Sequence, residues 1–318
     1  MKNYQKKPIF IISSGRTGST LISKILNKHK ELCVISDLIE PVGNNDFFIK
    51  ERKKISGKNF FKQVSRKTSE ARIKYWKIKK TKELLYFPKN EKEISCLNCY
   101  TLPFIFKNVK EKFKQIEKEF VKKKNKSKPK HLLDFFNLLK DLSHKKKFIE
   151  RTGGALHHIE KILDYFPDSK IILSYRNPIE TAISMRNYPF FRMYELMQNK
   201  KNLLSWNFQK KKPYWIYGKM LNHWYSIFFK NKNRIKKKNF FQYSFESLIA
   251  DPNIILEKIL KFILNKSKLS VYDKKFIKNS NIKIKNIDTK AQNLKAEEKK
   301  KLIMSLTDTI NKLYDIKI

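Results

Sequence analysis

Short apolar runs alternate along the chain with stretches whose apolar residues recur at helical spacing. The first run, Pro8 to Ser13 (PIFIIS), predicts a short buried strand. A loop covers residues 14 to 20, and Cys33 to Ser36 predict a second strand. Between the loop and that strand we expect a helix with one apolar face. This face comprises Leu21, Ile22, Ile25 and Leu26.

The same alternation returns from residue 147 onward. Lys147 to Glu150 predict a short strand, Ala155 to Phe166 predict an amphipathic helix, and Lys170 to Tyr175 predict a buried strand. The next helix is expected to have Asn177 as its N-cap and Pro178 at its first position. An order of strand, helix, strand and helix implies parallel pairing with right-handed crossovers.

The remaining C-terminal part adds helices and one more strand. Residues 213 to 230 predict an aromatic-rich helix, residues 239 to 244 a strand, and residues 252 to 264 and 294 to 314 further helices. The whole pattern therefore predicts an α/β protein with a central parallel β-sheet flanked by helices.

Residues 44 to 145 differ from this pattern because they are rich in lysine and mostly helical. Within them, Lys122 to Lys130 (KKKNKSKPK) predict a solvated loop or linker. We interpret the stretch as a helical insertion into a single domain, and not as a second α/β domain. The expected division is an α/β core at 8–41 and 147–264, the insertion at 44–145, and a C-terminal segment with a helix at 265–318, all within one domain spanning 1–318.

The net charge is strongly positive, at +43 from 72 Lys+Arg against 29 Asp+Glu. One interpretation is an anionic partner, such as nucleic acid, a membrane surface, or a phosphorylated or sulfated ligand. The basic residues run along the whole chain, and Lys, Asn and Ile are all abundant, which favours a compositional bias instead. In either case the positive field attracts a polyanionic cosubstrate.

Cysteine content and hydropathy bear on the compartment. The three cysteines, Cys33, Cys96 and Cys99, are too few for a disulfide framework and fit a reducing compartment. The single CxxC pair lacks the further ligands that a zinc site needs, so we expect no metal. No signal peptide is visible, and no apolar run approaches the roughly 18 residues of a transmembrane helix. We therefore expect a cytoplasmic protein, for which peripheral contact with a membrane stays open.

A glycine-containing loop, Ser14 to Thr20 (SGRTGST), joins the first predicted strand to the first helix. Backbone N–H groups at a helix N-terminus bind anions, and the helix dipole assists them. Glycines permit a tight turn, hydroxyls add donors, and an arginine adds a fixed charge. The predicted anion-binding residues are Gly15, Arg16, Thr17, Gly18, Ser19 and Thr20.

This loop is not a Walker A sequence, because no lysine follows Gly18. Without that lysine, and without an evident metal-binding acid on a second strand, ATP hydrolysis is disfavoured. On its own the loop is also compatible with an ordinary turn.

A second motif strengthens the interpretation of the loop as an anion site. Arg176 follows the strand that ends at Tyr175, and Ser184 lies two helical turns after Asn177 on the same helix face. Open α/β sheets bind ligands at the carboxyl ends of their strands. An arginine at this edge and a serine on the next helix are therefore expected to hold one phosphate together.

The two motifs together resemble those of the PAPS-dependent sulfotransferase superfamily, where PAPS is 3′-phosphoadenosine 5′-phosphosulfate. The loop at 15–20 looks like the family's 5′-phosphosulfate-binding loop. Tyr175 to Pro178 with Ser184 look like its 3′-phosphate-binding motif. Arginine in the loop is closer to the bacterial and tyrosylprotein branches than to the phenol-type branch. The resemblance covers residues 8–41 and 147–264 and implies a P-loop-like three-layer fold.

Two further segments share in the resemblance. Residues 245 to 252 are similar to the family's Tyr-Glu-Asp-Leu…Asp-Pro segment, although Phe245 replaces Tyr and Ser247 replaces Asp. These departures put a side-chain role at both positions in doubt. Glu150 to Gly154 look like the family's charged loop before the next helix.

The resemblance implies an in-line transfer of the sulfuryl group from PAPS to an acceptor hydroxyl or amine, with release of PAP and without a metal or redox cofactor. Arg16 and the loop amides are the predicted stabilisers of charge on the bridging oxygen. Arg151 matches a basic residue that faces the sulfuryl group in this family. Asp37 falls on the position of the general base in the tyrosylprotein branch, with Glu40 as the alternative.

Other assignments stay open at this point. His157 or His158 is a weaker alternative as the base, since both are expected within a helix. A small-molecule kinase, a basic nucleic-acid-binding protein and an inactive sulfotransferase scaffold are the competing functions. No nucleic-acid-binding motif is present, so we expect no nucleic-acid partner. The acceptor is not identified, and carbohydrate, lipid, peptide and small metabolite all stay open, with the 44–145 insertion expected on its side.

Overall fold

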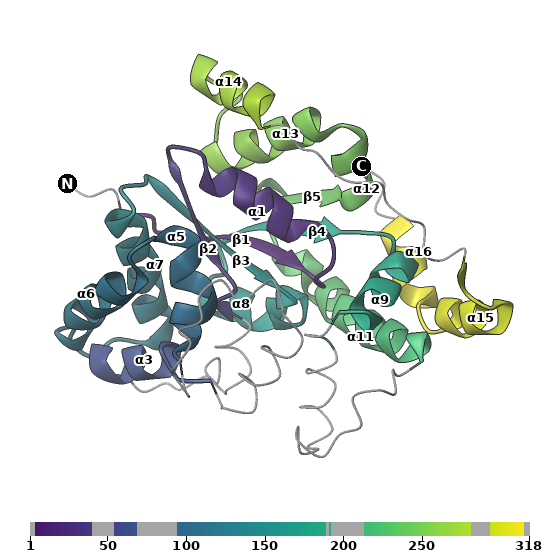
Figure 1. Ribbon diagram of the computed structural model, residues 1–318, viewed down its shortest axis with the longest axis horizontal. Coiled ribbons are helices and arrows are strands. Elements are labelled where there is room, and N and C mark those ends of the chain that lie inside the picture. Colours follow the sequence, from purple (N-terminus) through teal and green to yellow (C-terminus); the bar gives the residue numbers. More distant parts are fainter. Residues whose placement is uncertain are drawn as a thin grey trace. The chain divides into compact units, whose positions relative to one another are not determined.

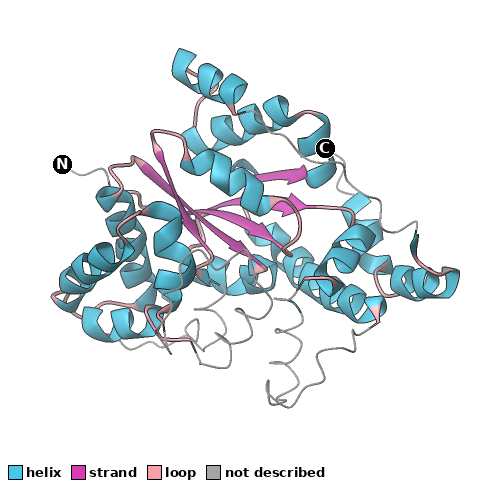
Figure 2. Cartoon of the chain, viewed as in Figure 1, coloured by secondary structure: helices cyan, strands magenta, loops and turns pink. Residues whose placement is uncertain are grey.

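A five-stranded parallel sheet flanked by helices forms the centre of the computed structural model, which confirms the predicted fold class (Figures 1 and 2). The strands are hydrogen-bonded in the order β2-β3-β1-β4-β5. Their bounds are β1 Ile9–Ser13, β2 Leu32–Ser36, β3 Lys147–Gly153, β4 Lys170–Tyr175 and β5 Phe240–Ser244. The structure describes residues 4–39, 54–68, 94–188, 191, 213–280 and 293–314.

The strand sequences account for their central place. Every residue of β1 and β2 is buried, because the two faces of a parallel sheet are covered by other elements. Continuous apolar runs such as IFIIS and LCVIS suit this environment, whereas strict alternation would suit a sheet with one solvated face. The predicted strands at 8–13, 33–36, 170–175 and 239–244 are therefore confirmed to within a residue.

The third strand is longer than predicted. Strand β3 continues from Lys147 to Gly153, so Arg151 and Thr152 lie on the strand and not in a loop after it. Its register against β2 pairs Leu32 with Lys147 and Ser36 with Arg151. The polar residues Glu150, Arg151 and Thr152 are buried here because they bond with one another and with the residues after β2.

The chain divides into two compact units. One consists of Met1–Ile11, Ser23–Gly153 and Lys161–Lys170, and the other of Ile12–Ile22, Gly154–Glu160 and Ile171–Ile318. In the first unit, helices accompany β2 and β3. They are α3 Gly57–Val64, a π-helical turn η1 Leu97–Thr101, α5 Leu102–Ile105, α6 Val109–Val121 and α7 Lys128–Leu142.

The predicted loop at 122–130 is shorter in the structure. Helix α6 reaches Val121, and α7 already begins at Lys128, because Pro129 fits the first turn of a helix, where its missing N–H has no partner to lose. Lys126 in the remaining loop pairs with Ile55 in an isolated antiparallel bridge. The helical character predicted for 44–145 is thus found at 57–64 and 97–142, and the rest of that stretch is largely outside the described residues.

Aromatic packing holds these helices together. The ring of Phe60 stacks on Phe120 at 5.4 Å and on His131 at 5.2 Å between centroids. The Nε2 of His131 lies 2.8 Å from the carbonyl oxygen of Ile55, so this nitrogen carries the proton. Burial lowers the pKa of His131 below its usual 6.5, although the Ile55 carbonyl and the nearby Asp134 oppose the shift.

Acid is therefore expected to destabilise this unit. Between pH 6.5 and the lower folded pKa, unfolded His131 binds a proton that folded His131 does not, so the free energy of unfolding falls as the pH falls. We expect His131→Gln, whose amide donates to Ile55 in the same way, to lose less stability between neutral pH and acid than the wild type. Urea unfolding at several pH values measures this. The exposed His144 provides a control, and His144→Gln should retain the acid loss. Equal acid losses in wild type and His131→Gln would contradict the assignment.

The second unit contains β4, β5 and most of the C-terminal helices. Its helices are α9 Pro178–Arg186, α11 Tyr214–Asn231, α12 Phe245–Ala250, α13 Pro252–Leu264, α14 Val271–Asn279, α15 Ala296–Met304 and α16 Thr307–Tyr314. Asn177 caps α9 as predicted, since its side chain accepts hydrogen bonds from the backbone of Ile179 and Glu180. The helix predicted at 294–314 is broken into α15 and α16.

The helix predicted at 155–166 is also divided. Residues Ala155–His158 form a 3₁₀ turn, and α8 follows at Ile159–Tyr165. The turn is preceded by Gly154 at φ 101°, a left-handed conformation that favours glycine.

Candidate functional site

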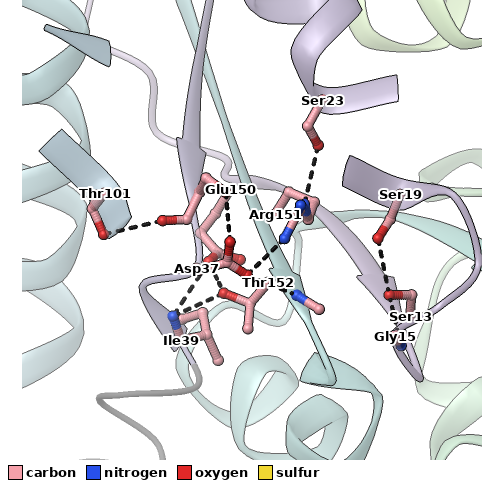
Figure 3. Close-up of polar contacts among 12 residues, drawn as sticks. Ser13, Gly15, Ser19, Ser23, Asp37, Ile39, Thr101, Glu150, Arg151 and Thr152 are labelled. Carbon is pink, nitrogen blue, oxygen red and sulfur yellow. Dashed lines mark hydrogen bonds and ion pairs between the residues drawn. The ribbon is translucent and has the colours of Figure 1, made fainter. Parts of the chain in front are cut away.

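The loop after β1 has the backbone of an anion-binding nest. Gly15, Arg16 and Gly18 have positive φ values of 82°, 60° and 78°, and helix α1 (Ser19–Asn27) begins directly afterwards. Arg16, Thr17 and Gly18 alternate in hand, because Thr17 lies between them without a positive φ. Such alternation turns successive N–H groups toward a common point and forms a nest in which an anion can bind. The hydroxyl of Ser13 accepts from the N–H of Gly15 at 3.1 Å and lies 3.3 Å from the hydroxyl of Ser19 (Figure 3).

Two phenylalanine rings pack directly on the loop glycines. A Cβ added to Gly15 would lie 2.6 Å from Cζ of Phe191, and one added to Gly18 would overlap the ring of Phe245. Glycine is therefore required at both positions for two reasons, which are the positive φ and the close approach of an aromatic ring. Neither ring was predicted from the sequence to contact the loop.

Alanine at Gly18 is expected to disturb the loop. The left-handed backbone costs a non-glycine residue about 1–2 kcal/mol, and displacing the Phe245 ring adds to this cost. We expect Gly18→Ala to lower the free energy of unfolding by about 2–4 kcal/mol, as measured by urea unfolding. Combining it with Phe245→Leu should recover part of the loss. The control is Gly153→Ala, because the nearest atom to its added Cβ is 3.7 Å away. Equal effects of the two alanines would be inconsistent with this packing.

The two sequence motifs of this unit meet at Arg16. Its Nε donates a hydrogen bond to the hydroxyl of Ser184 at 3.1 Å, and its guanidinium carbon lies 4.2 Å from the ring centroid of Tyr188. The buried Thr17 hydroxyl lies 3.1 Å from the hydroxyl of Ser174, which ties the loop to β4. Thr20, by contrast, is exposed in the first turn of α1.

Arg176 lies beyond the end of β4, with a side chain that is only 13% exposed. Its guanidinium carbon is 4.9 Å from the centroid of the Phe245 ring, and its Nη2 is 3.8 Å from the carboxylate of Glu180. Burial lowers the pKa of Arg176, Glu180 and Glu246 oppose the shift, and the positive charge of Arg16 adds to it. An arginine remains protonated under these conditions, so two guanidinium groups influence each other in one unit. An anion bound there relieves their repulsion.

Glu246 fixes the backbone next to Arg176. Its carboxylate accepts a hydrogen bond of 2.9 Å from the N–H of Asn177. In the adjoining position, Phe245 contributes its ring to both Gly18 and Arg176. Only the phenyl ring makes these contacts. Phenylalanine in place of the family's tyrosine at position 245 therefore still packs against Gly18 and Arg176.

In the other unit, Asp37 and Arg151 form an ion pair. Asp37 follows β2 at a φ of 55°, and its Oδ1 accepts from Nη1 of Arg151 at 2.6 Å and from the N–H of Gly153 at 3.2 Å. Its Oδ2 accepts from the hydroxyl of Ser36 at 2.8 Å. The carboxylate is therefore held in one orientation while its side chain stays 26% exposed.

Arg151 is oriented from its other side as well. Its side chain is 3% exposed, and its Nε donates to the hydroxyl of Ser23 at 3.2 Å (Figure 3). Removing Asp37 would leave this buried guanidinium without its carboxylate, which is costly. The structure thus brings together two residues that were selected separately from the sequence.

Glu150 is a residue of this cluster that no role was predicted for. It is fully buried, and its Oε1 accepts from the hydroxyl of Thr152 at 2.5 Å and from the N–H of Ile39 at 3.3 Å (Figure 3). Burial raises its pKa to about 8, and the negative charge of Asp37 adds to the shift. The only signal in the sequence was an acidic residue at the end of the predicted strand Lys147 to Glu150.

The alternative bases have different surroundings. The ring of His157 stacks on Trp224 at 4.8 Å between centroids with an interplanar angle of 26°, and His158 is 3% exposed. Both therefore belong to the packing of the turn Ala155–His158. Glu40 lies outside the described residues.

The chain was compared with known protein families, curated proteins and solved structures. A model of the sulfotransferase family matches residues 8–264. Sulfotransferase STF9 from Mycobacterium avium is 12% identical, with a TM-score of 0.49 over 95% of this chain and 76% of the other. The sulfotransferase domain of the Synechococcus PCC 7002 olefin synthase is 16% identical, with a TM-score of 0.47 over 96% and 90%. The sulfotransferase domain from the curacin biosynthetic pathway is 14% identical, with a TM-score of 0.49 over 95% and 98%. A search of curated proteins found no match.

Proposed function

Since the chain belongs to the sulfotransferase family, we propose that it transfers a sulfuryl group from PAPS to a hydroxyl or amine of an acceptor and releases PAP. The observation that carries the proposal is the contact between the two anion-binding motifs. Arg16 of the nest donates to Ser184 of the Arg-Ser motif, so both motifs serve one binding region within a single unit.

The donor fits this region by its charges. PAPS carries a phosphosulfate on the 5′ side of its ribose and a phosphate on the 3′ side. The nest at Arg16 to Gly18, with the hydroxyls of Ser19 and Thr20, would hold the phosphosulfate through backbone N–H groups. Arg176 and Ser184 would hold the 3′-phosphate, for which a guanidinium offers paired donors. A nucleotide lacking the 3′-phosphate would leave the positive charge of Arg176 without its partner.

The transfer requires a proton acceptor and stabilisation of the leaving group. The acceptor oxygen or nitrogen forms a bond to sulfur while the bond from sulfur to the bridging oxygen breaks. The bonding electrons pass to the 5′-phosphate of PAP, and the acceptor proton passes to the carboxylate of Asp37. Arg16 and the loop amides stabilise the charge that develops on the bridging oxygen, and Arg151 orients Asp37 and faces the sulfuryl group. None of these steps requires a metal or redox cofactor.

For the acceptor we propose only the group that reacts, a hydroxyl or an amine. We also propose a cytoplasmic location. None of the helices that the structure describes has the length and apolar character needed to span a membrane.

Ligand-induced stabilisation tests the proposal directly. A ligand that binds only the folded protein raises the melting temperature. We expect PAP to do so, and AMP, which lacks the 3′-phosphate, to do so far less at the same concentration. ATP and a short oligonucleotide test the kinase and nucleic-acid alternatives. Stabilisation by either of these without any by PAP would overturn the proposal.

A further inference from the structure

The carboxyl group of Glu150 connects β3 to the turn after β2 that carries Asp37. From the middle of β3, its Oε1 accepts hydrogen bonds from the hydroxyl of Thr152 and the N–H of Ile39. The Thr152 hydroxyl also accepts from the N–H of Ile39, at 3.0 Å. The main chain of Ile39, two residues after Asp37, is therefore held by a pair of buried side chains from the neighbouring strand.

The other end of the same turn is held as well. The N–H of Asp37 donates to the carbonyl oxygen of Arg151 at 2.7 Å, and the hydroxyl of Thr101 donates to the carbonyl of Ser36 at 3.0 Å. Asp37 itself has a φ of 55°, a conformation that a non-glycine residue adopts only when its surroundings hold it there. Releasing Ile39 would remove one of these restraints.

We propose that Glu150 is a positioning residue, which fixes the main chain of Ile39 and thereby holds the carboxylate of Asp37 in the orientation that proton transfer needs. The claim that Asp37 accepts a proton rests on the proposed function. The claim that Glu150 holds the turn rests on the hydrogen bonds that it accepts from Thr152 and Ile39. Glu150 acts through Asp37 and is not itself expected to contact the acceptor, because it is fully buried.

The protonation state of Glu150 follows from its surroundings. Among the described residues, none offers a hydrogen-bond partner to its buried Oε2. Burial is the main cause that raises the pKa to about 8, Asp37 raises it further, and Thr152, Ile39 and Arg151 oppose the shift. At neutral pH the group is therefore mostly a neutral acid. Because this pKa lies above the 4.5 of an ordinary glutamate, opening of the turn, which exposes the carboxyl group to water, becomes easier as the pH rises from 4.5 to about 8.

This state makes glutamine the matched replacement. Glu150→Gln keeps an acceptor oxygen for Thr152 and Ile39 and has no proton to lose. Glu150→Ala removes the acceptor and leaves a cavity. A role in positioning therefore predicts opposite outcomes for the two variants, whereas a proton-transfer role for Glu150 predicts loss in both.

The first measurement is hydrogen exchange at the amide of Ile39, corrected for the intrinsic pH dependence and compared between about pH 5 and about pH 8. We expect protection in the wild type that weakens as the pH rises through this range, equal protection at both pH values in Glu150→Gln, and little at either in Glu150→Ala. Difference infrared spectroscopy adds a direct readout, since Glu150→Gln should remove one protonated-carboxyl band. Weakening in Glu150→Gln that follows the wild type would overturn the inference.

The second measurement is PAP release from PAPS with tyramine, which offers both a hydroxyl and an amine. We expect kcat to fall about 100-fold in Glu150→Ala, since small misplacements of a catalytic group have effects of this size. Glu150→Gln should stay within about threefold of the wild type. Equal loss in both variants would overturn the positioning role.

A third arm separates this inference from the proposed function. Stabilisation by PAP should be the same in the wild type and in Glu150→Gln. If PAP stabilises neither protein, the proposed function fails, and the exchange of the Ile39 amide still decides whether Glu150 holds the turn.

Discussion

Arg176→Ala should bind PAP on the order of 100-fold more weakly than the wild type, because hydrogen bonds between a largely buried guanidinium and a phosphate are among the stronger polar contacts. The guanidinium is already held between the Phe245 ring and Glu180, so little conformational freedom is lost when a phosphate binds. Isothermal titration calorimetry with PAP measures the change. Arg176→Lys keeps the charge without the paired donors and should be intermediate.

The location of the loss identifies the phosphate that Arg176 binds. AMP lacks the 3′-phosphate, so its affinity should change little in Arg176→Ala. Arg186 supplies a matched control, because it lies on the following helix α9 and its guanidinium carbon is 4.0 Å from the ring centroid of Tyr214. Arg186→Ala should keep the PAP affinity of the wild type. An equal loss of AMP and PAP affinity in Arg176→Ala would contradict a 3′-phosphate site.

Asp37→Asn should retain PAP binding and lose turnover by about 10²–10⁴-fold, the usual contribution of a general base. Asparagine is the informative replacement, because its amide oxygen still accepts from Arg151 and from the N–H of Gly153. Alanine would also remove the oxygen that accepts from the buried Arg151, and would combine a larger loss of stability with the loss of chemistry. Single-turnover release of PAP from PAPS, together with calorimetry for PAP, separates the two effects.

Asp141 provides the control for this substitution. Its side chain is 22% exposed and forms an ion pair of 3.1 Å with Lys140, which is comparable to the 26% exposure and ion pair of Asp37. Asp141→Asn should leave turnover unchanged. If Asp37→Asn also turned over normally, the proton acceptor would have to be another group, and Glu40 would be the next to replace.

The hydrophobic pattern predicted the strands and helices whose own sequence contains the apolar run or apolar face that is buried. The strand at 170–175 and the helix after Asn177 have local signals that agree with their place in the fold. The strand at 147–153 was predicted to end at Glu150, because Arg151 and Thr152 look like a polar loop until their partners are known. Those partners, Asp37 and Ile39, precede them by more than a hundred residues, so no local pattern contains the information.

The residues of the candidate site likewise fall into those that the sequence pointed to and those that only the structure revealed. Motif spacing and the resemblance to the sulfotransferase family selected Arg16, Arg176, Ser184, Asp37 and Arg151 as candidates, and the structure joins Arg16 with Ser184 and Asp37 with Arg151. The spacing did not identify Phe191 and Phe245, since an aromatic residue far along the chain has no detectable relation to a glycine in the loop. Glu150 was missed for the opposite reason, because its neighbours in sequence were already interpreted as a charged loop.

Because the rings of Phe191 and Phe245 pack on the loop glycines, a substitution at a glycine and one at the ring above it depend on each other during evolution. A larger residue at position 18 meets the ring of Phe245, so it becomes acceptable only after that ring has been replaced by a smaller side chain. The smaller side chain, in turn, gives up the contact with Arg176. The order of replacement is therefore constrained, and lineages that diverge at this loop should change at position 245 first or at both positions together.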